Sequence, residues 1–180
     1  VPRELINEVG ERTTFDGQVV HPLDADDALR ALRQLADAGC TSVAICLLFS
    51  YANPSHEQQI AAIASEHFPE LALSVSSSLL PQWREYERAS TTVADAFIKP
   101  RMSRYFSKLE TELRDQGMKN DLLVMKSNSG LMTARSAAGE PIHTLLSGPA
   151  GGALAGKFIG AQAGYPDLIT MDMGGTSFDV

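Results

Sequence analysis

Residues 168–180 contain the residue types best suited to phosphate chemistry. A β-favouring run leads to an acid, two glycines break the strand, and two hydroxyls precede a second acid. In chain order these residues are Leu168, Ile169, Thr170, Asp172, Gly174, Gly175, Thr176, Ser177 and Asp179. The pattern predicts a strand, a tight turn and a returning strand.

Such a turn can bind an anion through its backbone. Adjacent glycines let the chain adopt positive φ and approach a ligand, so that successive N–H groups hold an anionic oxygen. Hydroxyls add donors, and a carboxylate at the strand end can hold hydrated Mg²⁺ beside a phosphate. On residue types alone, an ordinary glycine hairpin with two solvated acids explains the stretch equally simply, because a single Gly-Gly turn is a weak signal.

The order of residues 172–180 is more specific than their types. It resembles the second phosphate-binding loop of the actin-like ATPase superfamily, and residues 145–152 together with this loop are similar to the hydantoinase A and 5-oxoprolinase family. Residues 46–54, 84–94 and 124–130 also match that family, in the family's order. The resemblance spans nearly the whole chain.

The resemblance implies an α/β fold of the actin-like ATPase (ribonuclease-H-like) class, with a mixed sheet and flanking helices. Residues 1–140 would be the latter part of the N-terminal hydantoinase/oxoprolinase domain. Residues 141–180 would begin the core hydantoinase A ATPase domain, because Gly139 and Pro141 mark a connector there. The chain has no initiator Met and stops at Val180, within the expected returning strand, so we expect a piece of a longer polypeptide.

The activity implied is ATP-dependent hydrolysis of a cyclic amide, such as a hydantoin or 5-oxoproline, through phosphorylation of the amide oxygen. Asp172 would hold Mg²⁺ through water, and a hydantoinase B-type subunit or domain would be the partner. No catalytic residue is assigned. The expected ATP-binding residues are Asp172, Gly174, Gly175 and Thr176, with Ser177 and Asp179 supporting the loop.

Two alternatives stay open. Related sequences are subunits of ATP-dependent ketone carboxylases acting on acetone or acetophenone, and other members of the superfamily are non-catalytic nucleotide switches. Family members also carry an earlier Asp-x-Gly-Gly-Thr loop, which residues 1–167 lack. The isolated chain should therefore bind ATP poorly and catalyse nothing.

Composition limits the remaining possibilities. A net charge of −7 and a pI near 5.0 argue against a general nucleic-acid or anionic-membrane surface. Cys40 and Cys46 have no metal-ligand spacing and are expected to be free thiols in a reducing compartment. The longest apolar run, 43–49, is too short to span a bilayer, and we expect a cytoplasmic protein.

Patterns along the chain predict alternating strands and helices. A hairpin over 4–22 turns at Phe15–Gln18, and a helix runs from an Asp24 cap to Gly39. A buried parallel strand over 42–49, a helix starting with a capping box at Ser55 and Gln58, and a strand over 71–76 follow. A long helix after Pro81 should break or kink at Pro100, a strand should cover 121–126, and a small-residue helix should cover 148–164.

Four further groups of residues have open roles. Arg84 and Arg88, one helical turn apart, favour a solvated face with ion pairs over an acidic-ligand site. Ser127, Asn128 and Gly130 fit a ligand site after a strand or a simple turn equally well. Gly148, Gly151 and Gly152 favour close helix packing over nucleotide contact. The four histidines, His21, His56, His67 and His143, are expected at the surface or at helix caps.

Overall fold

A short hairpin opens the chain, as predicted. β1 (Arg12–Thr13) and β2 (Val19–His21) pair antiparallel, and Gly17 takes a φ of 85° in the turn between them. Asn53 donates its side-chain N–H to the Gly17 carbonyl at 2.8 Å, which ties this turn to a loop further along the chain. The hairpin is shorter than predicted, because residues Arg3–Leu5 form a 3-10 turn, η1.

The first long helix, α1 (Ala25–Asp37), has the predicted ends. The Asp24 carboxylate accepts a hydrogen bond from the Asp27 N–H at 2.9 Å and so satisfies one of the free donors of the first turn. Gly39 ends the helix with a φ of 81°, a conformation that glycine adopts without strain. Both predicted helix ends are confirmed.

A parallel strand pair follows, as the βαβ pattern predicted. β3 (Ser42–Ile45) and β4 (Ala72–Val75) pair in register along their whole length, and α2 (Ser55–His67) connects them. The predicted strand over 42–49 ends at Ile45, and the residues after it form a loop. This loop is important below, because polar groups gather there.

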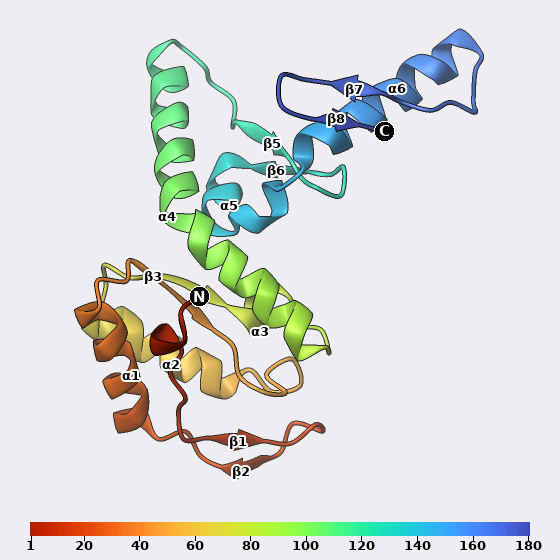
Figure 1. Cartoon of the computed structure of the whole chain (residues 1–180). Helices are drawn as coiled ribbons and strands as arrows, with labels where there is room; N and C mark the ends of the chain where they lie inside the picture. Colours follow the sequence, from red (N-terminus) through yellow and green to blue (C-terminus); the bar gives the residue numbers. More distant parts are fainter. The chain divides into compact units, whose positions relative to one another are not determined.

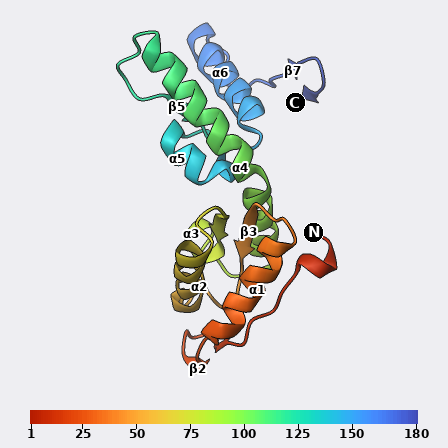
Figure 2. The ribbon, with the colours of Figure 1, turned by 90° about the vertical axis from the view of Figure 1, so that its left-hand side faces the viewer.

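Helices cover both sides of this strand pair. α1 and α2 lie side by side against it (Figures 1 and 2), and the first part of α4 (Glu85–Asp115) contacts β4. Lys99 of α4 donates to the Leu73 carbonyl at 2.7 Å, and Ser74 donates to Asp95 at 2.6 Å. The buried apolar residues of this core are Ala28, Leu32, Val43, Ile45, Ile60, Ala64 and Leu71. A short helix, α3 (Ser76–Leu79), follows β4.

Two local predictions are wrong. The residue before α2 is Pro54, and Asn53 rather than a Ser55–Gln58 capping box accepts a hydrogen bond from the Ser55 N–H, at 3.1 Å. The predicted break at Pro100 is also wrong, because α4 continues through it as one 31-residue helix, and the kink predicted as the alternative stays a prediction. One proline removes a single intrahelical donor, and a helix this long keeps its other hydrogen bonds.

The computed structural model describes all residues, 1–180, and the chain divides into two compact units, Val1–Arg101 and Met102–Val180. The second unit contains the antiparallel pair β5 (Leu123–Met125) and β6 (Leu131–Thr133) and the helix α5 (Ala134–Gly139). After η2 (Pro141–Thr144) come α6 (Ser147–Ala163) and the pair β7 (Asp172–Met173) and β8 (Phe178–Asp179).

The connector expected around Gly139 and Pro141 contains two short helices, α5 and η2, which the sequence pattern did not predict. Thr133 caps α5, its hydroxyl accepting the Ser136 N–H at 3.2 Å. Phe106 of α4 packs with Ala134 and Ala137 of α5 in a small core. Tyr105, the residue before Phe106, is mostly exposed.

The α/β class with small sheets and flanking helices is confirmed. The four sheets have two strands each, and only β3–β4 is parallel. No helix is both long enough and apolar enough to cross a membrane. The domain boundary near residue 140 stays a prediction.

Candidate functional site

The predicted phosphate-binding turn is a hairpin in the structure. Asp172 pairs with Asp179 and Met173 with Phe178, so four residues, 174–177, form the connecting turn. The Gly174 N–H donates to the Ser177 carbonyl at 3.0 Å and closes this turn. The Ser177 hydroxyl donates to the Asp179 carboxylate at 3.1 Å, so Ser177 braces the second acid.

The two glycines of the turn are not required by the hairpin itself. Neither Gly174 nor Gly175 adopts a positive φ, contrary to the expected local conformation. A Cβ atom added at Gly175 would meet nothing within 4 Å, and at Gly174 it would only reach the Ser177 carbonyl, at 4.0 Å. The turn is open to solvent, and residues 174–177 are all exposed. Side chains would fit here unless another group approaches the backbone.

The two acids of the hairpin face one another. Asp172 and Asp179 are direct cross-strand partners, and residues in such positions extend to the same face of the sheet. Like charges directly opposite destabilise a hairpin, and a cation between them would remove that repulsion. The acidic pair is therefore better explained by a bound cation than by the folding of the hairpin.

A row of glycines on α6 holds the chain that leads into this hairpin. A Cβ atom added at Gly160, Gly156 or Gly152 would contact Leu168, Thr170 or Asp172 respectively. Glycines four residues apart on a helix are separated by about 6 Å, and side chains two residues apart on an extended segment by about 6.6 Å. Because these spacings match, every second side chain of residues 168–172 lies against the next glycine of α6. At Gly152 the added Cβ would lie 3.1 Å from an Asp172 carboxylate oxygen. The glycine row thus sets the position of Asp172.

The first strand of the hairpin is shorter than predicted. Leu168 and Thr170 were expected in the first strand, but they lie against α6, and β7 begins only at Asp172. Gly151 lies close to β5, since its added Cβ would be 3.8 Å from the Met125 methyl carbon. Gly148, by contrast, has nothing within 4 Å. The packing interpretation of Gly151 and Gly152 is supported.

Substituting Gly160 by Ala should separate the 168–172 segment from α6. The new methyl group would lie 2.9 Å from the Tyr165 carbonyl oxygen and would overlap the Leu168 side chain. We expect the substitution to lower the free energy of unfolding by about 1–3 kcal/mol, the usual effect of overpacking. Gly148→Ala is the matched control and should be neutral or stabilising by up to about 1 kcal/mol. Hydrogen exchange of amides 168–173 is measured in both variants. Equal protection in Gly160→Ala and Gly148→Ala would contradict the packing of this segment on α6.

The hairpin would suit a magnesium ion that takes most of its ligands from water and from a bound phosphate. Hard cations take carboxylate oxygens, and Mg²⁺ commonly keeps several waters while sharing phosphate oxygens with its substrate. Asp172 and Asp179 are the carboxylates at the hairpin, and no group of three or more His, Cys, Asp or Glu residues gathers anywhere in the chain. Two carboxylates suit an ion that arrives with a nucleotide better than a fully protein-coordinated metal.

The Ser127–Gly130 turn has a structural explanation. It joins the antiparallel strands β5 and β6, and the Asn128 side chain accepts the Gly130 N–H at 3.2 Å. The Ser127 hydroxyl donates to the carbonyls of His143 (2.8 Å) and Leu145. Ser127 therefore anchors the segment that leads into α6, and the turn interpretation is favoured for Asn128.

A buried polar cluster surrounds Arg88, and no sequence pattern predicts it. Arg88 is fully buried, 3.8 Å from the fully buried Glu57 carboxylate, so the predicted solvated position is wrong for it. Arg84 does lie at the surface, where its guanidinium is 3.4 Å from Glu87. The two arginines do not form one site.

His56 is a second correction. It is buried rather than at the surface, and its Nδ1 lies 2.8 Å from a Glu11 carboxylate oxygen, joining α2 to the strand region of β1. Cys46 and Cys40 are free and half-buried, as predicted. Burial raises the pKa of the Cys46 thiol, although a hydrogen bond with Ser76 opposes this, so Cys46 is a neutral thiol near pH 7 and not a nucleophile.

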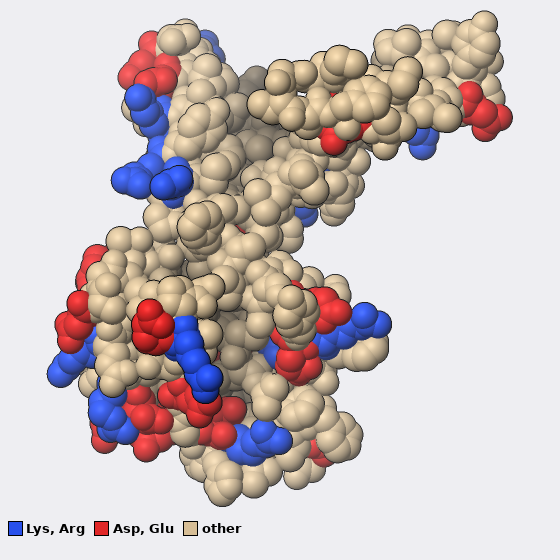
Figure 3. All heavy atoms as spheres, in the orientation of Figure 1, with Lys and Arg blue, Asp and Glu red and all other residues tan.

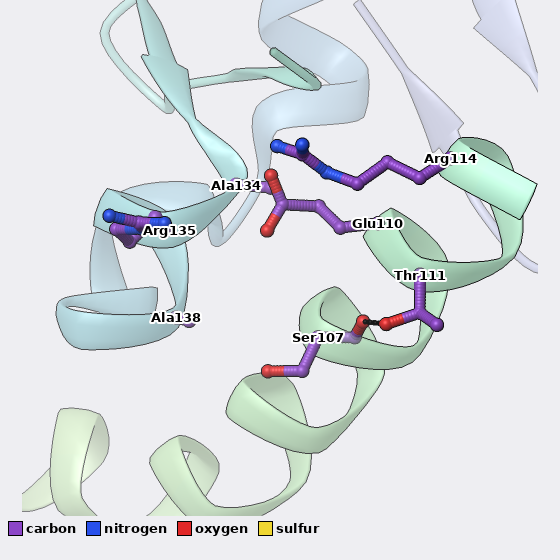
Figure 4. Close-up of a pocket in the computed structure, with 7 residues that line it drawn as sticks. All are labelled: Ser107, Glu110, Thr111, Arg114, Ala134, Arg135 and Ala138. Atoms are coloured by element: carbon purple, nitrogen blue, oxygen red, sulfur yellow. Dashed lines mark hydrogen bonds between the residues drawn. The ribbon is translucent and has the colours of Figure 1, made fainter. Parts of the chain in front are cut away.

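A hollow of about 400 Å³ lies between α4 and α5 within the second unit (Figure 4). Glu110 and Arg114 extend from α4, and Arg135 extends from α5. It is lined by Ser107, Glu110, Thr111, Arg114, Ala134, Arg135 and Ala138. Its charged groups are of mixed sign and largely exposed, so they favour no class of ligand. The hairpin remains the candidate site.

Comparison with known proteins identifies two family models that match this chain. The hydantoinase/oxoprolinase model matches residues 88–180, and the model of the hydantoinase/oxoprolinase N-terminal region matches residues 1–68. The first of these covers just over half of the chain and includes both α6 and the candidate hairpin.

Known relatives share about a third of their residues with the chain. The caprolactamase alpha subunit of Pseudomonas jessenii is 34% identical over 180 residues, which are 100% of this chain and 26% of that protein. The 5-oxoprolinase 1 of Arabidopsis thaliana is 34% identical over 165 residues, covering 91% of this chain and 13% of that protein. The chain therefore spans about a quarter or less of the length of these relatives.

Two solved structures have the same fold. An ATP-dependent caprolactamase from Pseudomonas jessenii superimposes with a TM-score of 0.89 at 34% identity, over 99% of this chain and 26% of that one. A nucleotide-free acetone carboxylase superimposes with a TM-score of 0.90 at 33% identity, over 99% of this chain and 25% of that one. Both are similar over all described elements, including the hairpin.

Proposed function

Because the chain belongs to the hydantoinase/oxoprolinase family, we propose that it is part of an ATP-dependent enzyme that opens a cyclic amide. ATP dependence is a stated property of the caprolactamase and acetone carboxylase structures it resembles. Caprolactamase and 5-oxoprolinase are named for ring-amide substrates. A hydantoin or 5-oxoproline is our preferred substrate class.

The observation that carries the proposal is the open glycine pair between two opposed acids. Gly174 and Gly175 are glycines although the hairpin leaves room for side chains at both. Glycine at both positions leaves space for phosphate oxygens to approach the backbone N–H groups. Asp172 and Asp179, opposed across the strands, would then face the cation that accompanies the phosphates.

In the proposed reaction, the amide oxygen attacks the γ-phosphorus of ATP, and the bond from that phosphorus to the ADP oxygen breaks. Water then adds to the activated carbon, the ring carbon–nitrogen bond breaks, and the nitrogen leaves as a protonated amine. A second water hydrolyses the resulting acyl phosphate. The N–H groups of Gly175 and Thr176 would bind phosphate oxygens, with Ser177 holding Asp179 in place.

Mg²⁺ would be held through water by Asp172, and when bound it supplies neutralisation of the charge on the phosphate oxygens. Asp179 faces Asp172 and would add a second negative group toward the same ion. The glycine row on α6 keeps the Asp172 carboxylate beside the helix. The backbone of 168–172 thus pre-positions the ligand group before nucleotide arrives.

A partner subunit and a cytoplasmic location complete the proposal. The caprolactamase relative is one subunit of its enzyme, which supports a hydantoinase B-type partner for this protein. Both cysteines are free thiols, which supports a reducing compartment.

The second candidate is an ATP-dependent ketone carboxylase. The acetone carboxylase structure supports it, since it matches the chain as closely as the caprolactamase does. Both reactions begin with phosphoryl transfer, so one hairpin could serve either. The difference lies in the group that accepts the phosphoryl.

ATP hydrolysis by the longer natural polypeptide with its partner subunit tests the proposal. We expect 5-oxoproline, hydantoin or caprolactam to stimulate ADP release with ring-opened product in equal amount. Acetone with bicarbonate is the comparison substrate. Stimulation only by ketone and bicarbonate would identify the protein as part of a carboxylase. If none of these compounds stimulates ATP hydrolysis, both enzymatic proposals are contradicted and a nucleotide switch is favoured.

A further inference from the structure

Polar side chains gather at one end of the parallel pair β3–β4. The loop after β3 supplies Ser50, α3 after β4 supplies Ser76 and Ser77, and the first turn of α4 supplies Glu85 and Arg88. All three segments follow or adjoin the carboxyl ends of parallel strands, the edge at which α/β sheets collect ligand groups. This set of residues, with Glu57 of α2, is called the Arg88 cluster below.

Hydrogen bonds hold most of the cluster in place. Arg88 Nη1 donates to the hydroxyls of Ser76 (2.6 Å) and Ser50, and Nη2 donates to the Leu47 carbonyl at 2.7 Å. Glu57 accepts from the Leu47 N–H (2.7 Å), the Ser76 hydroxyl (2.6 Å) and the Ser77 N–H (2.8 Å). The guanidinium and the Glu57 carboxylate therefore have fixed orientations.

Three buried polar atoms of the same cluster make no hydrogen bond within the chain. They are Arg88 Nε, Glu85 Oε1 and Ser77 Oγ, and only one other buried side-chain atom of the whole chain, Asn7 Nδ2, shares this property. Glu85 Oε1 lies 3.6 Å from Arg88 Nη2, too far for a hydrogen bond. An unpaired buried polar atom costs about 1–3 kcal/mol, so a bound group that pairs the three atoms would stabilise the cluster.

The charges and hydrogen-bonding types restrict that ligand. Two carboxylates, Glu57 and Glu85, oppose one guanidinium, so the cluster repels an anion. A cation such as an ammonium offers no acceptor to Arg88 Nε. The ligand must be neutral and must present an acceptor beside a donor: the acceptor for Arg88 Nε and the donor for Glu85 Oε1.

We propose that Arg88 Nε, Glu85 Oε1 and Ser77 Oγ bind the amide group of a ring amide. In a small ring the amide is cis, so its C=O and N–H lie side by side and can meet the guanidinium and the carboxylate together. An open-chain secondary amide is trans and points the two groups in opposite directions. The inference deepens the proposed function, on which it rests for the substrate class, by assigning substrate-recognition residues.

Glu85 connects the cluster to the surface, although its Oε1 atom is buried. The Glu85 side chain is 36% exposed, and exposed aromatic residues, Trp83 and Tyr86, flank it in sequence. Trp83 is the single tryptophan of the chain, and the Arg84 guanidinium lies 4.7 Å from the centre of its ring system. Trp83 emission is therefore a natural reporter for a ligand that reaches Glu85.

The test titrates the full 180-residue chain, without ATP, with 2-pyrrolidinone, and follows Trp83 emission and ligand-observed NMR together. We expect saturable binding. N-methyl-2-pyrrolidinone, which lacks the N–H, and N-methylacetamide, which is trans, should each bind at least about 10-fold more weakly, because each loses a hydrogen bond to a charged group. Glu85→Gln and Ser77→Ala should weaken 2-pyrrolidinone binding, by about 10-fold for the first.

Glu87→Gln is the matched control, because Glu87 lies two residues from Glu85, is exposed and pairs with Arg84 instead. It should bind 2-pyrrolidinone like the unmodified chain. No saturable binding in either measurement, equal binding of the N-methylated ring, or unchanged binding by Glu85→Gln would overturn the inference. A crystal structure with Glu85 bonded directly to Arg88 Nε in the presence of 2-pyrrolidinone would do the same. Since no ATP is present, these results are independent of the ATP-turnover test.

Discussion

Replacing Arg88 by Met should lower the free energy of unfolding of the first unit by about 3–5 kcal/mol, the usual effect of removing one partner of a buried ion pair. Arg88 and Glu57 are both fully buried, and their charged groups lie 3.8 Å apart. Without the guanidinium, the Glu57 carboxylate keeps its hydrogen bonds to Leu47, Ser76 and Ser77 but loses its neutralising charge. Ser50 and the Leu47 carbonyl lose their donor as well.

Urea unfolding followed by Trp83 emission measures this loss, because Trp83 lies in the first unit, two residues before Glu85 of the cluster. Arg84→Met is the matched control: its ion pair with Glu87 is exposed and contributes at most about 1 kcal/mol. The double variant Arg88→Met, Glu57→Gln should recover part of the loss, since it removes the stranded charge too. A loss below about 1 kcal/mol in Arg88→Met would contradict the network.

The Arg88 cluster also shows where sequence reasoning stops. An arginine four residues from another, among glutamates, has the local pattern of a solvated helix face. Its burial depends on Ser50, Glu57 and Ser76, which lie 38, 31 and 12 positions away in sequence. No periodicity encodes which distant polar groups will meet. The same holds for the burial of His56 beside Glu11, 45 positions earlier.

Local signals, by contrast, predicted elements well wherever one residue decides the geometry. Asp24 and Gly39 fixed the ends of α1, and Gly17 fixed the first turn. The prediction failed for α5, because its cap, Thr133, was assigned to a connector, and its apolar face is only two alanines, Ala134 and Ala137. Short helices with small side chains carry too little pattern to be recognised.

For the candidate site, the sequence predicted a hairpin but not its support. The two glycines after a β-favouring run predicted the turn over 174–177, although the turn itself does not require glycine at either position. The packing of residues 168–172 depends on α6, where Gly152, Gly156 and Gly160 at four-residue spacing receive alternate side chains of an extended chain. The glycine-rich composition of α6 was visible, but its partner segment was not.

The hairpin carries apolar groups that its own unit leaves exposed. Ile169, Met171 and Met173 alternate with the residues that face α6, and all three are more than 70% exposed. Figure 3 shows the surface over α6 and the hairpin as almost free of charged residues. The site that we propose for ATP is thus attached to an apolar surface, and tests of turnover belong in the longer polypeptide.

In that longer polypeptide, Asp172→Asn should reduce amide-stimulated ATP turnover by about 10²–10³-fold, the effect of removing one electrostatic group that stabilises a transition state. The substitution keeps the size of the side chain beside Gly152, so the packing on α6 is retained. It removes the negative charge proposed to hold Mg²⁺ through water. Raising the Mg²⁺ concentration should restore part of the activity, since the ion would bind more weakly rather than elsewhere.

Stability separates this role from a purely structural one. Asp172 faces Asp179 across the hairpin, and like charges in that position repel, so Asp172→Asn should leave the melting temperature unchanged or raise it. Asp167→Asn, an exposed acid in the preceding loop, is the control and should alter neither turnover nor melting. Full turnover in Asp172→Asn would show that Asp172 is not part of the ATP site. A variant that loses turnover only together with its folded structure would make the acid a structural residue, because the repulsion argument predicts the opposite change in stability.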